Sequence, residues 1–131
     1  MIGNYKHGIV SDDDLTIAGG QISIVAHTDG LHANDAIAIT GGNLEIPDAN
    51  DAIESEGTLA VEGGALTLKA EDDGLVSGGE FLINGGVIVV SAGVEGIESK
   101  ASLVVNGGEI TVNVTDDGLS AANDLTINGG V

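Results

Sequence analysis

The chain has 131 residues, a length typical of a single domain. Its formal net charge is −18 at pH 7, with only three Lys or Arg residues, so nucleic acid is excluded as a partner because neutralising phosphates requires cations. No apolar run approaches the roughly 18 residues of a membrane-spanning helix, which excludes membrane insertion. Gly occurs 22 times, whereas the aromatic residues are Tyr5 and Phe81. This composition suits a thin, layered interior of β-branched and small side chains.

Gly-Gly pairs recur every 22 residues along the whole chain. They begin, without insertion or deletion, at Gly19, Gly41, Gly63, Gly85, Gly107 and Gly129. The pairs divide the chain into coils at residues 1–18, 19–40, 41–62, 63–84, 85–106 and 107–128, and residues 129–131 begin another. A fixed period of roughly 20–50 residues is typical of solenoid proteins. We therefore expect residues 1–131 to form one continuous domain.

Each coil contains three short stretches in which apolar or small residues, which we expect to face inward, alternate with other residues. In the coil that begins at Gly19, these stretches are residues 22–24, 31–33 and 37–39. The pattern repeats at 44–46, 53–55 and 59–61, at 66–68, 75–77 and 81–83, at 88–90, 97–99 and 103–105, and at 110–112, 119–121 and 125–127. Alternation over three residues is typical of a short strand with one buried face. Phe81 falls in an inward column, so we expect it in the core.

Three short strands and three turns per coil predict a parallel β-helix. Equivalent strands of successive coils would pair in parallel, about 4.8 Å apart. A helical alternative fails because the apolar spacing is not helical and the Gly-Gly pairs would interrupt any helix. Parallel crossovers are right-handed by default. We predict an all-β, right-handed parallel β-helix (solenoid) of about six 22-residue coils, with Gly-Gly corners that need a positive φ or a close backbone approach.

One column of the repeat carries a carboxylate in five successive coils. It comprises Asp29, Asp51, Asp73, Glu95 and Asp117, and a second carboxylate precedes it at Asp72 and Asp116. Stacked at strand spacing, these like charges repel one another. Carboxylate oxygens at that spacing can flank one Ca²⁺, whose Ca–O distances are about 2.3–2.6 Å. Because oxygen ligands without Cys favour a hard cation, we predict that these seven residues bind Ca²⁺.

The alternative is that this column serves only the turns. Asp-Gly is a common turn dipeptide, and an Asp side chain can hydrogen-bond its own turn. Both interpretations stay open for any single residue of the column. The doubled sites at residues 72–73 and 116–117, with Glu95 between them, favour calcium.

Two other groups of polar residues are interpreted without a ligand. A less regular acidic corner, at residues 12–14, 34–35 and 123–124, is interpreted as a solvated turn, with a metal site at its low-numbered end as the alternative. The scattered His7, His27 and His32 are interpreted as exposed surface residues and not as zinc ligands.

Several segments resemble a known family. YKHGIVSDDDLTI (residues 5–17), DGLHANDAIAI (residues 29–39) and the repeated DDGL and EGIES runs are similar to bacterial carbohydrate-binding domain-containing proteins with a pectate-lyase-like fold. The resemblance covers essentially the whole chain. It implies a right-handed parallel β-helix, bound calcium, and binding of plant-type or acidic polysaccharides outside the cell or at its surface. Those proteins are longer, so we expect this chain to be a fragment of a longer domain; its first ten residues do not resemble a signal peptide.

Three functions are compatible with these observations. The first, which we predict, is a noncatalytic, calcium-stabilised polysaccharide-binding module. The second is structural, because uncapped β-helix ends expose unpaired strand edges and the rod could stack end to end into fibres. The third is catalysis as a polysaccharide lyase or a glycoside hydrolase. We expect no enzyme, because the acidic motif recurs nearly unchanged and marks no single distinctive site.

Overall fold

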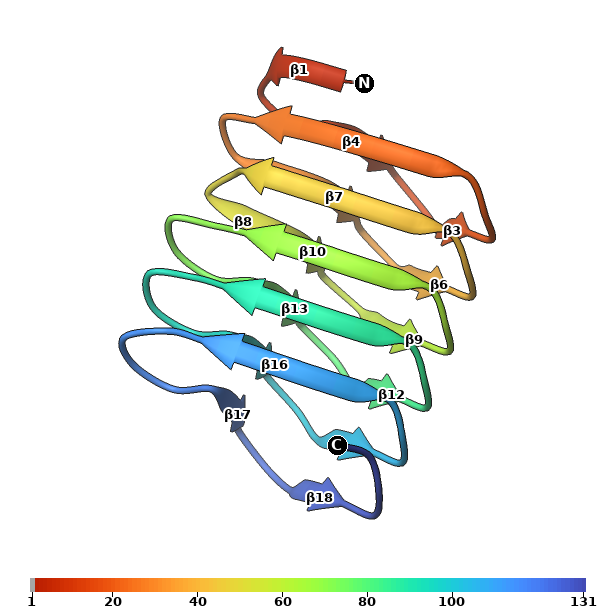
Figure 1. The fold of residues 1–131 in the computed structure, drawn as a ribbon, viewed down its shortest axis with the longest axis vertical. Helices are drawn as coiled ribbons and strands as arrows, with labels where there is room; N and C mark the ends of the chain where they lie inside the picture. The colour runs from red at the N-terminus through yellow and green to blue at the C-terminus, as the bar shows by residue number, and fades with distance from the viewer. Residues whose placement is uncertain (1) are drawn as a thin grey trace.

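The computed structural model describes residues 2–131, which form eighteen strands and no helix. Among these residues there is accordingly no helix that could cross a membrane. The strands stack into a rod, with three strands in each coil (Figure 1). Viewed along the rod from its N-terminal end, the chain turns clockwise as it recedes, so the coil is right-handed (Figure 1). The predicted all-β parallel β-helix is confirmed.

Equivalent strands form three six-stranded parallel sheets. The first sheet contains β1 (Ile2–Tyr5), β4 (Gln21–Ala26), β7 (Asn43–Asp48), β10 (Ala65–Lys69), β13 (Val87–Ser91) and β16 (Glu109–Asn113). The second contains β2 (Ile9–Ser11), β5 (Asp29–Ala33), β8 (Asp51–Ser55), β11 (Leu75–Ser77), β14 (Ile97–Ser99) and β17 (Leu119–Ala121). The third contains β3 (Leu15–Ile17), β6 (Ala36–Ile39), β9 (Thr58–Val61), β12 (Phe81–Ile83), β15 (Leu103–Val105) and β18 (Leu125–Ile127).

The strands pair with the 22-residue offset of the sequence repeat. In the second sheet, for example, Leu75 is paired with Ile53 on one side and with Ile97 on the other. The same offset holds in the third sheet, where Phe81 pairs with Leu59. Each column of the repeat therefore becomes a stack of side chains that runs along the rod.

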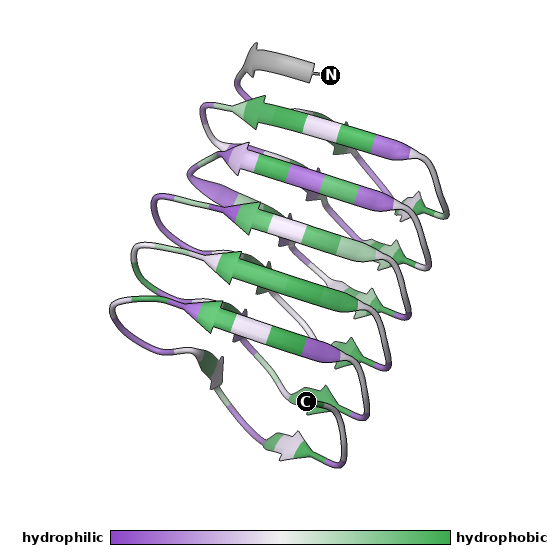
Figure 2. Cartoon of the chain, in the orientation of Figure 1, coloured by the Kyte–Doolittle hydropathy of each residue, from purple (hydrophilic) through white to green (hydrophobic). Residues whose placement is uncertain are grey.

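Apolar side chains that alternate along each strand fill the interior of the rod. Inward residues such as Ile46, Ile53 and Leu59 are fully buried. Figure 2 shows apolar residues recurring along successive strands. Each such burial contributes about 1.5–3 kcal/mol. Phe81 is 1% exposed, which confirms its predicted place in the core.

Serines at the end of the second-sheet strands close the next corner. Ser55, Ser77 and Ser99 are buried. Ser55 Oγ donates a hydrogen bond to the Thr58 carbonyl oxygen at 2.7 Å, and Ser99 Oγ donates to the Ser102 carbonyl oxygen at 3.0 Å. These bonds satisfy the buried hydroxyl groups and fix the turn that leads into the third sheet.

An asparagine ladder runs along the corner that precedes the last three Gly-Gly pairs. Asn106 Nδ2 donates to Asn84 Oδ1 at 2.8 Å, and Asn128 Nδ2 donates to Asn106 Oδ1 at the same distance. Asn84 in turn donates to the Glu62 carboxylate. The ladder links successive coils through side chains as well as backbone.

The Gly-Gly corners meet both expected requirements. The second glycine of every pair has a φ between 90° and 101°. A Cβ atom on Gly64 would also lie 3.0 Å from the Gly42 carbonyl oxygen, in the coil before. Glycine is therefore needed both for its backbone conformation and for the close stacking of the coils.

We expect Gly64→Ala to destabilise the protein more than Gly20→Ala. Both glycines have nearly the same φ, 93° and 90°, but a Cβ on Gly20 would meet nothing within 4 Å. The left-handed conformation costs about 1–2 kcal/mol in both variants. Gly64→Ala should lose at least about 1 kcal/mol more, because the contact with Gly42 adds overpacking. Urea unfolding measures the difference, and equal losses would contradict the close-approach argument.

Candidate functional site

The acidic column lies at the corner between the first and second sheets. Asp29 begins β5 and Asp51 begins β8, and the two residues are paired in register. Asp73, Glu95 and Asp117 each lie two residues before the first residue of β11, β14 and β17. The fold therefore stacks the predicted ligands along one edge of the rod.

The column brings some of the predicted ligands close together and leaves others apart. Asp51, Asp72 and Asp73 each offer a carboxylate oxygen, and these oxygens all lie within 4.8 Å of one another. Asp29 and Asp51 form a similar group with Glu54, which is not one of the ligands predicted from the sequence. Among residues 2–131, the predicted ligands Glu95, Asp116 and Asp117 belong to no such group.

Backbone hydrogen bonds occupy one oxygen of two carboxylates in the column. The Asp73 backbone N–H donates to Asp51 Oδ1 at 3.0 Å, and the Glu95 backbone N–H donates to Asp73 Oδ1 at 3.0 Å. These bonds join successive coils and do not cap the residue's own turn. They occupy Oδ1 of Asp51 and of Asp73, and the second oxygen of each carboxylate remains available to a ligand.

The electrostatics of the column favour an added cation. Burial is the main cause that raises the pKa of Asp51 to about 6, and the charges of Asp73, Glu54 and Asp72 raise it further. Burial likewise raises the pKa values of Asp73 and Glu95. Buried like charges hold protons more tightly when no cation is present to replace them.

The Glu95 side chain also lacks a hydrogen-bond partner for one of its oxygens. Its Oε2 atom is buried and has no hydrogen-bond partner. A buried acceptor without a partner calls for an explanation such as an ion or a water molecule. Oxygen donors, shared negative charge and an unpartnered buried oxygen are together compatible with Ca²⁺, which takes six to eight oxygen ligands.

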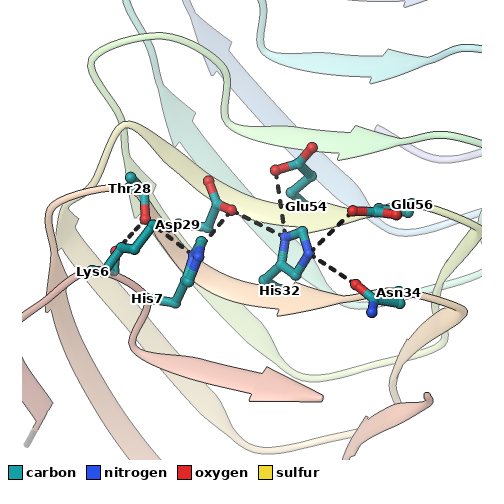
Figure 3. A network of polar contacts seen from close by, with 8 residues as sticks. All are labelled: Lys6, His7, Thr28, Asp29, His32, Asn34, Glu54 and Glu56. Atoms are coloured by element: carbon teal, nitrogen blue, oxygen red, sulfur yellow. Dashed lines mark hydrogen bonds and ion pairs between the residues drawn. The ribbon is translucent and has the colours of Figure 1, made fainter. Parts of the chain in front are cut away.

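A histidine cluster lies at the low-numbered end of the column (Figure 3). His7 Nδ1 and His32 Nδ1 lie 3.3 Å and 3.1 Å from the same atom, Asp29 Oδ2. The two rings have centroids 5.2 Å apart. The interpretation of His7 and His32 as scattered, exposed residues was therefore wrong, because the coil brings them together; their side chains are 25% and 14% exposed. His27, by contrast, is exposed as expected.

The cluster is polar on every side of Asp29. The Asp29 side chain is 7% exposed, and burial is the main cause that raises its pKa. Burial also raises the pKa of Glu54, whose Oε2 lies 3.5 Å from His32 Nδ1. The pKa of His7 is lowered by burial and by the neighbouring His32. Two carboxyl groups and two imidazoles therefore share a small, partly dehydrated space.

The repeat frame carried a signal for this cluster. His7 lies 22 residues before Asp29, so it occupies the acidic column in the first coil. His32 follows Asp29 by three residues, and with Asp29 at the corner that begins β5 the two side chains meet, with His32 Nδ1 3.1 Å from Asp29 Oδ2. Extending the acidic column to the first coil would have placed His7 beside Asp29.

The second acidic corner has no comparable arrangement. Asp12, Asp13 and Asp14 are exposed, as are Asn34 and Asp35 one coil later. Their backbones pair between coils, with the Asp35 N–H donating to the Asp13 carbonyl oxygen at 3.2 Å. This exposure agrees with the prediction of a solvated turn.

The chain matches one protein family along its full length. The family is described as carbohydrate-binding domain-containing protein, and the match covers residues 1–131. No curated protein and no solved structure gives a significant match. The complete coverage shows that the chain belongs to the carbohydrate-binding domain-containing protein family.

Proposed function

We propose that the protein is a noncatalytic polysaccharide-binding module, stabilised by calcium and located outside the cell or at its surface. The family match over residues 1–131 is the single observation that supports carbohydrate binding. The acidic column supports the calcium part. A noncatalytic role is in keeping with a binding-domain family and with an acidic motif that recurs in successive coils.

Calcium would be held first by Asp51, Asp72 and Asp73, whose oxygens lie within 4.8 Å of one another. Glu95 continues the column with its unpartnered buried oxygen. The remaining predicted ligands extend the same edge at Asp29, Asp116 and Asp117. Bound Ca²⁺ would neutralise stacked charges that otherwise repel one another, and so would stabilise the rod.

The rod also offers a regular surface to an extended sugar chain. A shallow hollow on the outer side of the first sheet is lined by Gln21, Ser23, Asn43 and Glu45. Amide, hydroxyl and carboxylate groups are suited to sugar hydroxyls. The equivalent positions of the next two coils are Ala65 and Thr67, then Val87 and Val89, so this polar hollow is confined to the first coils of the sheet. With a net charge of −18, the protein would need a cation to bridge its carboxylates to the uronates of an acidic polysaccharide.

End-to-end stacking into fibres stays an alternative. Light scattering that grows with protein concentration and time would favour it over a monomeric binding module.

Calcium should raise the melting temperature of the metal-stripped protein. A ligand at about 100 times its Kd adds about 2.7 kcal/mol, which corresponds to roughly 10 °C for a domain of this size. Asp72→Asn should lose most of this gain because it removes a carboxylate from the group around Asp51. Asp12→Asn, an equally exposed residue outside the column, is the control. An unchanged melting temperature with and without calcium would overturn the calcium proposal.

The pH dependence of stability should change sign when calcium is added. Without metal, Asp51 has a folded pKa of about 6, above the unfolded value of about 3.9. Its contribution to stability is therefore present at low pH and is lost as the pH rises through about 6. We expect about 1 kcal/mol less stability at pH 7 than at pH 5 from this partly exposed group.

With calcium bound, protons compete with the cation, so acidification should instead destabilise the protein. Urea unfolding at both pH values measures each slope. The difference between the wild type and Asp51→Asn isolates this carboxyl group from His7, whose lowered pKa acts in the opposite direction. The same slope with and without calcium would contradict the argument.

Polygalacturonate is the probe for carbohydrate binding. We expect co-sedimentation with the polymer in calcium and a loss of binding when a chelator is added. The same mixtures should show no growth of reducing ends and no absorbance from unsaturated products. Steady turnover would overturn the noncatalytic proposal, and failure to bind this and neutral plant polysaccharides would overturn the binding proposal.

A further inference from the structure

At its low-numbered end the acidic column changes chemistry, because His7 stands where later coils have a carboxylate. We propose that His7, Asp29 and His32 form a binding site for a divalent transition-metal ion such as Zn²⁺, with Glu54 as a fourth ligand. This site differs from the proposed calcium site in its donor atoms and shares Asp29 with the acidic column.

Three distances between donor atoms around Asp29 and His32 are close to those of a tetrahedral metal site. Zinc binds imidazole nitrogen and carboxylate oxygen at about 2.0–2.2 Å, so ligand atoms in a tetrahedron lie about 3.3–3.6 Å apart. The Nδ1 atoms of His7 and His32 lie 3.3 Å and 3.1 Å from Asp29 Oδ2. Glu54 Oε2 lies 3.5 Å from His32 Nδ1. Small side-chain adjustments would therefore place one ion among four donor atoms.

Neighbouring acceptors orient the ring of His32 for this role. Its Nε2 atom lies 3.2 Å from Asn34 Oδ1 and 3.5 Å from Glu56 Oε1 (Figure 3). In the tautomer with the proton on Nε2, these two acceptors hold the ring, and Nδ1 presents its lone pair to a metal ion bound beside Asp29. Metal-binding histidines commonly donate their other N–H to a carboxylate or carbonyl in this way.

The Thr28 hydroxyl contacts His7 Nδ1 and would be displaced from it by a metal ion. Thr28 Oγ1 donates to the Lys6 carbonyl oxygen and lies 3.0 Å from His7 Nδ1. In the metal-free protein this hydroxyl can accept the proton of Nδ1. Metal binding at Nδ1 requires the tautomer of His7 with its proton on Nε2, so the ring proton would move from Nδ1 to Nε2 and the hydrogen bond to Thr28 would be replaced by the metal.

The donor set and its burial favour a borderline ion over calcium. Two imidazole nitrogens suit zinc, copper, iron or nickel, whereas calcium takes oxygen ligands. The Asp29 side chain is 7% exposed and lies near Glu54 and Asp51. A divalent ion would compensate the charge of the buried Asp29 and of the partly buried Glu54 and Asp51 beside it, which the two neighbouring imidazoles do only when they are protonated.

The test uses untagged, metal-stripped protein, because an added histidine tag would compete for the ion. Titration with Co²⁺, followed by its visible absorption, and competition with Zn²⁺ should give one site per chain. His7→Ala and His32→Ala should each weaken Zn²⁺ binding by at least about 100-fold, since even partners that only orient a ligand contribute about 10–100-fold. His27→Ala, which removes the exposed histidine, should leave the affinity unchanged.

Two further measurements separate the site from a general effect on folding. His32→Gln keeps a hydrogen-bonding side chain beside Asp29 and should keep the unfolding free energy of the metal-free protein, yet lose Zn²⁺ affinity. Zn²⁺ should also shift the ¹⁵N resonances of both Nδ1 atoms, and excess Ca²⁺ should not reverse this shift. Absence of a Zn²⁺ site, equal affinity in the His7, His32 and His27 variants, or displacement by Ca²⁺ would overturn the proposal.

Discussion

Parallel pairing of each strand with the strand one coil later is the constraint on which the rest of the structure depends. The offset of 22 residues puts each side chain directly against its counterpart in the next coil, as Leu75 pairs with Ile53 and Ile97. A residue type is therefore favourable only if it tolerates a copy of itself about 4.8 Å away. Apolar residues pack in such a stack, and asparagines donate to one another, as Asn106 does to Asn84. Glycine pairs allow the backbones to approach where a Cβ would collide.

Carboxylates do not tolerate this stacking without compensation. Asp51 and Asp73 accept backbone hydrogen bonds from the next coil, which offset part of the repulsion. Burial is the main cause that raises the pKa of Asp51, and the neighbouring charges of Asp73, Glu54 and Asp72 raise it further when no cation is present. A protein that keeps such a stack at neutral pH must either hold protons there or bind positive ions. This physical choice is the reason that we connect the acidic column to calcium.

The sequence predicted the fold closely because every strand and turn recurs within the same 22-residue repeat. The Gly-Gly pairs give the length of the coil, and alternation around residues such as Ile53 and Phe81 gives the inward faces. The histidine cluster could not be found in the same way, because His7 and His32 each occur once and belong to different columns. Their meeting depends on two separate relations, the 22-residue offset from His7 to Asp29 and the three-residue spacing from Asp29 to His32. Repeated motifs reveal which residues stack in one column, but a contact between residues of different columns that each occur once leaves no repeated pattern.

The same register would allow one rod to carry both of the cation sites that we propose. Within a column of carboxylates, neighbouring coils offer oxygen atoms alone, as the group of Asp51, Asp72 and Asp73 does. A single substitution in the column changes the donor set for the adjacent coil as well, since each residue faces its counterpart. With His7 in place of a carboxylate, Asp29 is shared between imidazoles on one side and the acidic column on the other. An ion held among the histidines would draw on the Asp29 charge and lower the repulsion that Asp51 experiences. Occupancy of the two sites would then be coupled through Asp29, and the coupling would have the same magnitude whichever ion bound first.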